Sequence, residues 1–434
     1  MARSLLRTPP ARGPFAPDFW RSPMRGIRFT SVLGVVLLAG ITILFVTGLL
    51  SYAAYNPDLA RVNDMTPGKG LLGFYLFSWP TDPPWLYRLT QGVHVTLGLA
   101  LVPVLLAKLW SVVPRLFTLP PVRSLTHALE RISLLLLVGG ALFEFVTGIL
   151  NVQLDYVFPG SFYPLHFYGA WVFFGAFLAH VVLKAPVAFR NLRAMREEWG
   201  GEGGRGGRDG SPVTDGAADE LAAPRPDPPT VSRRGAFGLV GGASLLLFAT
   251  SAGRSFDGPL RETAVLTPHG GPEPGGGPAG FQINKTAAYV GVRAGETSKE
   301  AWRLTVAGRS GTVRLNRADL LGLPLHSADL PIACVEGWST SDQWWRGVRL
   351  RDLAALVGHD EPVDVLVESL QRRGPFRRAA LRSNQVEDPR SLLALFVNGE
   401  ELTLDHGYPA RIIVPAAPGV LNTKWVERLT FGEV

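Results

Sequence analysis

Cysteine is almost absent from this chain, because Cys334 is the one cysteine among 434 residues. A single cysteine excludes an intrachain disulfide, so the thiol is either an inert buried group or a thiolate with a chemical role. Charged residues make up only 18% of the chain, and the sequence has no phosphate-binding glycine loop. These absences argue against a disulfide scaffold and a nucleotide-binding fold, and they turn attention to the apolar segments.

Long apolar segments fill the N-terminal part of the chain. Five stand out, at residues 29–52, 87–110, 125–152, 164–189 and 235–252. The first four exceed the roughly 20 residues that a helix needs to cross a bilayer, and the fifth is shorter. The sequence therefore predicts a multi-domain protein that begins with an all-α bundle of four transmembrane helices over residues 29–192. A fifth membrane span is predicted over residues 231–253.

The distribution of basic residues predicts the orientation of these spans. Arginine and lysine gather in residues 1–28, between the second and third apolar segments and after the fourth, whereas residues 151–165 contain neither. Because cytoplasmic loops are enriched in these residues, segment 1–28 is predicted to be cytoplasmic and loop 151–165 to lie outside. The net charge of +7 is thus interpreted as loop charge at a membrane, with no nucleic-acid partner.

A polar segment rich in glycine, proline and aspartate, residues 193–230, is predicted to be a disordered cytoplasmic linker. The motif Ser232-Arg-Arg-Gly-Ala-Phe237 follows it and resembles a twin-arginine export signal. One interpretation is that the twin-arginine machinery exports a folded, cofactor-loaded domain behind a retained span. The alternative is an ordinary anchor whose Arg233 and Arg234 obey the positive-inside rule. We expect residues 254–434 to lie outside the cytoplasm.

Two apolar hairpins share an internal repeat. Phe45-Val-Thr-Gly-Leu-Leu50 in the first segment matches Phe145-Val-Thr-Gly-Ile-Leu150 in the third. His94 and His166 hold corresponding places in the second and fourth segments. Segments one and two therefore look like a duplicate of segments three and four, which places His94 and His166 at similar depth near the outer face.

Four histidines are candidates for binding haem iron. His180 lies 14 residues after His166, a distance of ~21 Å along nearly the same helix face, so it reaches the inner side of the membrane. His127 opens the third segment at a similar depth. The predicted pairs are His94 with His166 and His127 with His180, because two imidazoles on facing helices are the axial ligands of a low-spin haem. Each histidine alone would also fit an interfacial polar residue.

This histidine pattern resembles the four-helix di-haem b cytochromes of formate dehydrogenases and nickel-iron hydrogenases. The resemblance covers about residues 25–190 and implies two b haems and electron exchange with quinone. The first segment has no histidine, unlike the usual arrangement in that family. Glu144 in the third segment suggests proton handling or a quinone contact, with snorkelling of the side chain to the interface as the alternative.

The C-terminal part, residues 254–434, has a different pattern. Short β-like runs cover residues 303–306, 363–367, 394–397 and 411–414, and short helical stretches cover residues 317–322 and 350–357. Turn residues separate these runs, and no long βαβ repeat is visible. The sequence predicts a mixed α+β domain.

The residues around Cys334 resemble the molybdenum-cysteine segment of the sulfite oxidase family. The match begins with Ile332-Ala-Cys-Val-Glu-Gly-Trp-Ser339. It continues in order with Trp345-Arg-Gly-Val-Arg-Leu350, Asn398-Gly-Glu-Glu-Leu402, Asp405-His-Gly-Tyr-Pro-Ala-Arg-Ile-Ile-Val-Pro415 and Lys424-Trp425. The resemblance implies that Cys334 ligates molybdenum, which suits a soft thiolate donor. It also places Asn284, His406, Arg411 and Lys424 at positions that contact molybdopterin.

Two residues bear on the substrate. Ile283 stands where sulfite-oxidising members of the family carry an arginine that binds the anionic substrate. Glu336 matches a carboxylate of the periplasmic methionine sulfoxide reductase branch, and it joins Cys334 as a predicted catalytic residue. The sequence therefore favours oxygen-atom transfer such as S- or N-oxide reduction, with a small-molecule or oxidised-residue substrate outside the cytoplasm. The alternatives are a sulfite-type oxidase that delivers electrons to quinone, and a non-enzymatic haem carrier or sensor.

Five arginines gather late in the chain, at Arg372, Arg373, Arg377, Arg378 and Arg382. We expect a solvated loop here, with a contact to the membrane or to the pterin phosphate as the alternative.

Overall fold

The structure is a computed structural model. It describes residues 13–16, 19–22, 25, 27–59, 77–117, 124–152, 159–200, 227–256, 258–266, 277–373 and 377–432. Most of the predicted basic segment 1–28 and much of the predicted linker 193–230 therefore lie outside the described residues. The chain divides into two compact units. One contains Met1–Phe45, Leu97–Val146 and Gly169–Phe248, and the other contains Val46–Thr96, Thr147–Tyr168 and Ala249–Val434.

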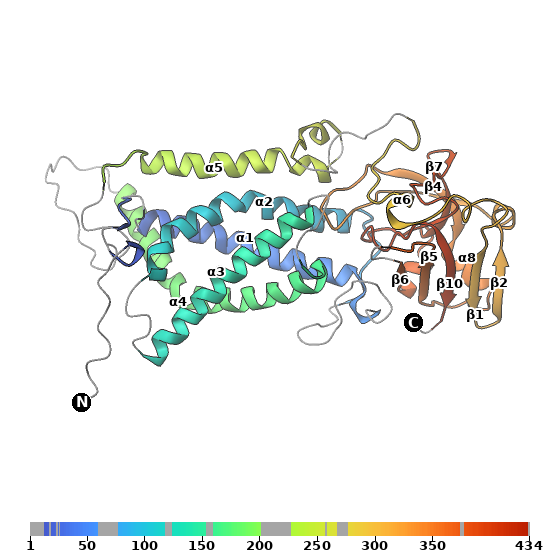
Figure 1. The fold of residues 1–434 in the computed structure, drawn as a ribbon, viewed down its shortest axis with the longest axis horizontal. Helices are drawn as coiled ribbons and strands as arrows, with labels where there is room; N and C mark the ends of the chain where they lie inside the picture. The colour runs from blue at the N-terminus through green and yellow to red at the C-terminus, as the bar shows by residue number, and fades with distance from the viewer. Residues whose placement is uncertain are drawn as a thin grey trace. The chain divides into compact units, whose positions relative to one another are not determined.

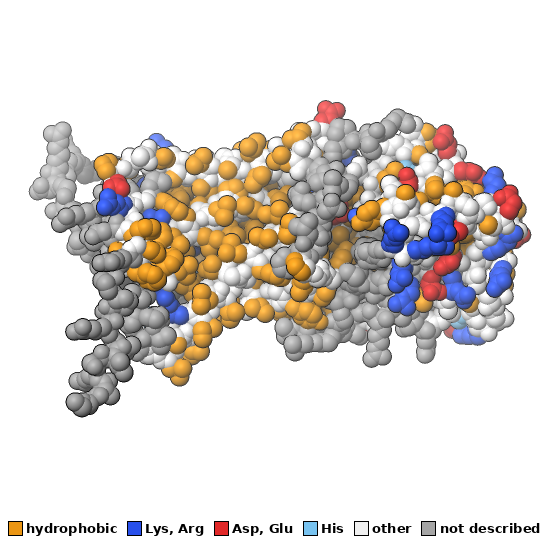
Figure 2. All heavy atoms as spheres, in the orientation of Figure 1, with side chains coloured by type: hydrophobic (Ala, Val, Ile, Leu, Met, Phe, Trp, Pro, Cys, Tyr) orange, Lys and Arg blue, Asp and Glu red, His pale blue; other side chains and the backbone are white. Residues whose placement is uncertain are grey.

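Long helices form at each of the five predicted apolar segments (Figure 1). They are α1 (Ile27–Ala54), α2 (Leu86–Val112), α3 (Leu125–Val152), α4 (Phe162–Gly200) and α5 (Arg233–Ala249). Within the described part of the chain, five segments are long and apolar enough to cross a membrane, namely Phe29–Ala54, Leu86–Val112, His127–Val152, Phe162–Val182 and Arg233–Ser255. Hydrophobic side chains dominate the visible surface of the helices (Figure 2). The helix α4 continues to Gly200, past residue 193 where the linker was predicted to begin.

In the first unit, the helices pack through side chains at helical spacing. Residues four apart on α1 line one buried face, namely Phe29, Leu33, Leu37 and Ile41. They join Leu101 and Leu105 of α2, together with Phe173 and Phe177 of α4, in one hydrophobic cluster. Because side chains four residues apart lie on the same side of a helix, this spacing accounts for how α1 packs.

The C-terminal domain is a mixed α+β fold, as predicted. Its helices are α6 (Ala287–Val290), α7 (Arg317–Leu321), α8 (Leu350–Ala355) and α9 (Ser383–Glu387). Its strands are β1 (Leu304–Gly308), β2 (Gly311–Leu315), β3 (His326–Leu330), β4 (Gln343–Arg349), β5 (Val365–Ser369), β6 (Arg378–Leu381), β7 (Leu392–Val397), β8 (Glu400–Glu401), β9 (Arg411–Ile413) and β10 (Val426–Phe431). Acidic and basic side chains gather on the visible face of this domain (Figure 2).

The strands form two five-stranded sheets. One has the order β2-β1-β10-β5-β6, in which β1 and β10 run parallel and the other neighbours run antiparallel. The other has the order β3-β4-β7-β8, with β9 added beside β7, and all its pairs are antiparallel. The loop between β3 and β4 contains Cys334, and the segment after β9 leads to Lys424, so the second sheet positions the predicted site.

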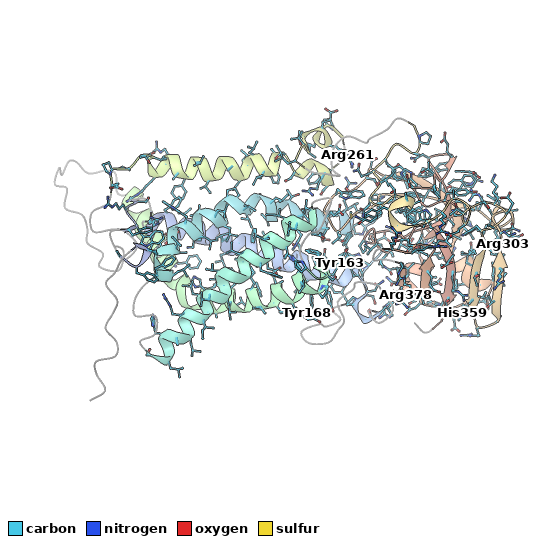
Figure 3. The ribbon with its side chains drawn as sticks, in the orientation of Figure 1. Tyr163, Tyr168, Arg261, Arg303, His359 and Arg378 are labelled. Atoms are coloured by element: carbon cyan, nitrogen blue, oxygen red, sulfur yellow. The ribbon has the colours of Figure 1, made fainter. Side chains whose placement is uncertain are left out.

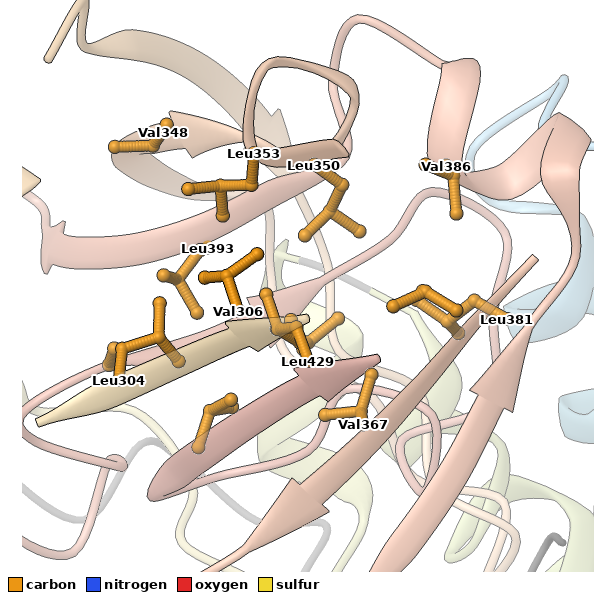
Figure 4. Close-up of a cluster of buried hydrophobic side chains, with 14 of the residues drawn as sticks. Leu304, Val306, Val348, Leu350, Leu353, Val367, Leu381, Val386, Leu393 and Leu429 are labelled. Atoms are coloured by element: carbon orange, nitrogen blue, oxygen red, sulfur yellow. The ribbon is translucent and has the colours of Figure 1, made fainter. Parts of the chain in front are cut away.

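Buried hydrophobic side chains from the strands and short helices of this domain form its core (Figure 4). Leu304 and Val306 alternate with less buried residues along β1, and Val365 and Val367 do so along β5. This period of two predicts strands with one face on the core. In contrast, β7 (Leu392–Val397) is buried on both faces except at one position, which agrees with its central place in the second sheet.

Within the second unit, the chain between α1 and α2 binds the C-terminal domain. The Asn56 amide donates to Gln385 Oε1 at 2.9 Å and to the Ala380 carbonyl at 3.0 Å. The indole of Trp79, which is 1% exposed, donates to the Ala416 carbonyl at 2.7 Å. These buried hydrogen bonds join residues more than 300 positions apart, so they define how the domain meets the ends of α1 and α2.

The late arginines form ion pairs in addition to facing solvent. Arg382 pairs with Asp58 and, at 3.5 Å, with Asp364. Arg372 pairs with Glu296. Arg378, which Figure 3 labels on β6, is exposed. The expectation of a solvated loop is therefore wrong for Arg382, because its partner Asp58 comes from the segment after α1.

Candidate functional site

Cys334 lies in a tight loop between β3 and β4. Its N–H donates to the Trp338 carbonyl at 2.8 Å, and its own carbonyl accepts from the Gly337 N–H at 3.0 Å. Gly337 has a φ of 86°, a conformation that glycine adopts without steric cost. A further hydrogen bond of 2.6 Å joins the Gly419 N–H to the Ala333 carbonyl. The loop therefore holds the thiol in one position.

The thiol is buried beneath aromatic side chains. Cys334 is 4% exposed. Tyr55, Tyr87 and Tyr163 form one hydrophobic cluster with Ala333 and Val335, its two neighbours in the loop. The hydroxyls of Tyr55 and Tyr87 lie 3.2 Å apart, and the rings of Tyr55 and Tyr163 have centroids 5.6 Å apart. Figure 3 shows Tyr163 near the start of α4. These tyrosines exclude water from one side of the thiol.

Burial raises the pKa of the Cys334 thiol well above its usual value. The nearby Glu336 carboxylate raises it further, and the Lys285 ammonium opposes this effect. A thiolate in this position therefore needs a compensating positive charge. A bound metal ion supplies that charge, because thiolate ligation displaces the proton outright.

The cationic side chains of Arg411 and Lys424 lie close together, and among the described residues the structure pairs them with backbone carbonyls. Arg411 is 4% exposed, and its guanidinium donates to the carbonyls of His406 and Asn422 at 3.0 and 3.1 Å. The Lys424 ammonium donates to the carbonyls of Lys285 and Asp405 at 2.5 and 2.9 Å. Burial lowers the pKa of Arg411 to about 9 and that of Lys424 to about 7. Two costly cations held close together by neutral carbonyls form a binding site for an anion.

Gly407 brings these two cations together. Its φ is 109°, and a Cβ at this position would lie 3.1 Å from the Cβ atoms of both Arg411 and Lys424. Any other residue here would be strained and would press on both side chains. The glycine of the Asp-His-Gly-Tyr-Pro motif therefore allows Arg411 and Lys424 to lie close together.

His406 and Asn284 connect the cations to the thiol. The Asn284 amide donates to Cys334 Sγ at 3.4 Å. His406 Nε2 donates to the Phe281 carbonyl at 3.3 Å, and Nδ1 accepts from the Thr403 hydroxyl at 2.8 Å. Burial and the Arg411 charge lower the pKa of His406 to about 4, so the ring is neutral. His406 thus braces the segment that carries Asn284.

Several buried polar atoms of this group make no hydrogen bond within the part of the chain that the structure describes. They are Asn284 Oδ1, Arg411 Nε, Asn422 Nδ2 and Thr423 Oγ1. Buried polar atoms are normally satisfied, so a concentration of exceptions indicates a ligand. The residues fit molybdopterin, because Arg411 Nε, Asn422 Nδ2 and the Thr423 hydroxyl would donate to its phosphate and ring acceptors, Asn284 Oδ1 would accept from a ring N–H, and Cys334 would bind its metal. When bound, the group supplies two-electron oxygen-atom transfer.

Glu336 lies two residues from the thiol and is partly buried. The Trp338 indole donates to its carboxylate at 2.8 Å, and its backbone carbonyl accepts from Arg254 at 2.9 Å. The structure therefore places all five predicted C-terminal positions, Asn284, Cys334, His406, Arg411 and Lys424, in one connected group, with Glu336 beside the thiol.

Residues 291–434 match the family model described as oxidoreductase molybdopterin binding domain. The C-terminal region is therefore similar to the molybdopterin-binding domain of sulfite oxidase-family oxidoreductases. Mitochondrial sulfite oxidase of Mus musculus is 31% identical over 156 residues, which cover 30% of this chain and 29% of that protein. The uncharacterized oxidoreductase YuiH of Bacillus subtilis is 32% identical over 131 residues, 30% of this chain and 65% of that protein.

Among solved structures, the sulfane dehydrogenase SoxCD from Paracoccus pantotrophus shares 26% identity with this chain. The match covers 32% of this chain and 39% of that one, with a TM-score of 0.29. The chain thus spans less than a third of the length of the mammalian sulfite oxidases it matches. The comparisons concern the molybdopterin domain.

The four histidines predicted to bind haem lie on α2, α3 and α4. The rings of His94 and His166 meet edge-on, with centroids 6.3 Å apart and planes at 81°. His127 lies in the first turn of α3, where its N–H donates to the Ser124 hydroxyl, and His180 lies half-buried in α4. The predicted outer pair is therefore brought together, and the pairing of His127 with His180 stays a prediction. Glu144 is buried in α3.

Residues of the site that the sequence analysis missed come from two sources. Asn422 and Thr423 directly precede the quoted Lys424-Trp425 motif, so extending that motif by two residues would have found them. Tyr87 and Tyr163 lie at the starts of α2 and α4, and Tyr55 directly follows α1. Their aromatic rings at helix ends are also typical of membrane interfaces, so their sequence pattern gives no signal for a contact with Cys334.

We expect Lys424→Met to reduce bound molybdopterin while leaving the cofactor-free domain at least as stable. Methionine keeps the packing volume and removes a cation that folding takes out of water. The lowered pKa of Lys424 also predicts that the cofactor-free wild type gains stability as pH rises from about 7 towards 10.5, because only the unfolded state still binds the proton. Thermal unfolding across that range should show a smaller gain in the variant, and an equal gain would contradict the assignment.

Proposed function

We propose that this protein is a membrane-bound molybdopterin-dependent oxidoreductase that exchanges electrons between the quinone pool and a substrate outside the cytoplasm, through two b haems. The observation that carries the proposal is the contact between the Cys334 loop and α2. The Gln91 amide donates to the Val335 carbonyl at 2.5 Å, and Gly337 lies directly against Val95. His94 lies between these two positions on the same helix.

The positions of His94 and His166 fit an axial pair for haem iron. His94 and His166 would be the two protein ligands that hold the iron of a haem b between α2 and α4. The centroids of their rings lie 6.3 Å apart. When bound, haem accepts and donates single electrons. His94 and His166 lie near the N-terminal ends of α2 and α4. On α2, Gln91 and Val95, which flank His94, contact Val335 and Gly337 of the Cys334 loop.

The reaction we favour is reduction of an S- or N-oxide. In balanced form, a sulfoxide takes two electrons and two protons and yields a thioether and water, and a quinol supplies both. Ile283 supports a substrate without charge, since no arginine stands at that position. Residues 254–434 are proposed to lie outside the cytoplasm. The proposed export signal is the pair Arg233 and Arg234, which begin α5.

The experiment uses purified full-length protein reduced with a small excess of dithionite. Methionine sulfoxide, dimethyl sulfoxide and trimethylamine N-oxide are then added in turn while the haem bands are recorded, and sulfite is added to a separate sample of oxidised protein. Reoxidation by an oxide, and not by buffer, supports the proposal. Reduction of oxidised protein by sulfite would instead support the sulfite-type oxidase. A chain that holds haem but no molybdenum from a cofactor-competent host supports a carrier or sensor.

Lys285 favours sulfite-type oxidation as a second candidate. It follows Asn284 directly, and its ammonium is near enough to Cys334 to lower the pKa of that thiol against the effects of burial and Glu336. A cation at this place attracts an anionic substrate even though Ile283 does not.

If the substrate is sulfite, we expect Lys285→Met to raise its KM by about ten-fold or more, because a nearby charge is worth at least ~1.4 kcal/mol in a partly buried site. The KM for a neutral sulfoxide should stay within two-fold. Steady-state kinetics with both substrates decides between the two candidates. An equal change in KM for both would show that Lys285 does not recognise charge.

A further inference from the structure

The repeated Phe-Val-Thr-Gly segments of α1 and α3 each meet a histidine on the following helix. Thr47 Oγ1 lies 3.0 Å from His94 Nδ1, and Thr147 Oγ1 lies 3.1 Å from His166 Nδ1. Both threonines are buried, at 9% and 0% exposure. The same hydrogen bond therefore occurs twice, once in each hairpin of the duplicated bundle.

A threonine hydroxyl in a helix can donate to a carbonyl one turn earlier in its own helix. Thr42 does so one turn earlier on α1, where its hydroxyl donates to the Leu38 carbonyl at 2.7 Å. Thr47 and Thr147 reach another helix, and in both cases they reach the same ring nitrogen. A hydrogen bond to Nδ1 sets the tautomer and the plane of an imidazole, and it makes Nε2 the nitrogen directed to a metal.

The glycines that follow the two threonines make room for the rings. A Cβ at Gly48 would lie 3.3 Å from His94 Cε1, and a Cβ at Gly148 would lie 3.7 Å from His166 Cε1. The first distance is tighter than an ordinary contact and the second is not. Each imidazole thus lies against the backbone of the neighbouring helix, with its Nδ1 on the threonine.

We propose that Thr47 and Thr147 are paired positioning residues for the outer haem, one for each axial histidine. The inference rests on the proposed haem assignment. Each hydroxyl accepts the Nδ1–H of its histidine, which fixes the ring plane and raises the basicity of Nε2. Because the two hydrogen bonds are equivalent, the two histidines are matched in orientation and in donor strength.

The test compares Thr47→Val and Thr147→Val with wild type and with Thr42→Val as the matched control. Valine keeps the shape of threonine and removes the hydroxyl. We expect each of the first two variants to raise the midpoint potential of one haem and to release that haem roughly ten-fold more readily, since partners of a metal-ligating histidine typically contribute 10- to 100-fold in affinity. Thr42→Val should match wild type in both measurements.

Two further variants keep the outcome clear. Thr47→Ser retains the hydroxyl and should restore both the potential and the haem retention. Gly148→Ala should leave the haem unchanged, whereas Gly48→Ala should disturb it. If wild-type protein holds haem and neither valine variant changes its potential or retention, the inference is wrong and the haem assignment stands. A shift in only one variant refutes the paired role. If wild-type protein from a haem-sufficient host binds no haem, the proposed function itself fails.

Discussion

Cys334→Ser is expected to abolish turnover while leaving the haem spectrum intact. Serine keeps the size of cysteine but replaces the soft thiolate with a hydroxyl that stays protonated in a buried site, so the donor for the metal is lost. The loss of turnover should exceed the roughly 100-fold that is the upper value typical of residues that only support a metal ligand. Molybdenum content and substrate-driven reoxidation of the haem bands measure the two effects separately.

The histidines supply an internal control for this variant. The Cys334 loop touches α2 through Val335 and Gly337, and the backbone hydrogen bonds of Cys334 do not involve its sulfur. The bundle should therefore fold normally in Cys334→Ser, and the haem bands should reduce with dithionite as in wild type. Wild-type turnover in this variant would overturn the assignment of Cys334 as the molybdenum ligand.

His166→Ala should remove one b haem per chain, and His94→Ala should remove the same one. Because the two rings lie 6.3 Å apart as a pair, the double variant should lose no more haem than either single variant. His180→Ala should remove the other haem if the inner pairing is correct. The measurement is haem per chain by pyridine haemochrome.

His326→Ala is the matched control for these variants. His326 lies on β3 of the C-terminal domain, where it pairs with Asp352 at 3.5 Å, so its loss should not change the haem content. Unchanged haem in both His94→Ala and His166→Ala would rule out the axial pair. Independent losses that add in the double variant would show that the two histidines serve different haems.

The sequence predicted most of the candidate site because its residues fall in short ordered motifs. Cys334, Arg411 and Lys424 each lie in a motif that resembles one family, and the structure connects them through Asn284 and His406. The repeat around Thr47 and Thr147 was also visible. The contacts of these two threonines could not be predicted, because a repeat shows that two helices are alike and does not show which neighbouring side chain each one contacts.

Contacts across long sequence separations were the part that could not be predicted. Asp58 forms an ion pair with Arg382, and the Trp79 indole donates to the Ala416 carbonyl. Neither Asp58 nor Trp79 lies in a recognisable motif. In the sequence, nothing distinguishes Tyr55 from any other aromatic residue that follows an apolar helix. Its burial against the Cys334 loop depends on how the β3–β4 loop packs on the helix ends, and hydrophobic periodicity contains no record of that packing.

The aromatic cover over Cys334 has a consequence for biogenesis. Tyr87 and Tyr163 lie in the first turns of α2 and α4 and Tyr55 directly follows α1, and together they pack against the loop that carries the thiol. A large pterin has to reach Cys334 before those helix ends close over it. We therefore expect the cofactor to enter the C-terminal domain first and docking onto the helix ends to come last, so that docking also protects the cofactor from loss.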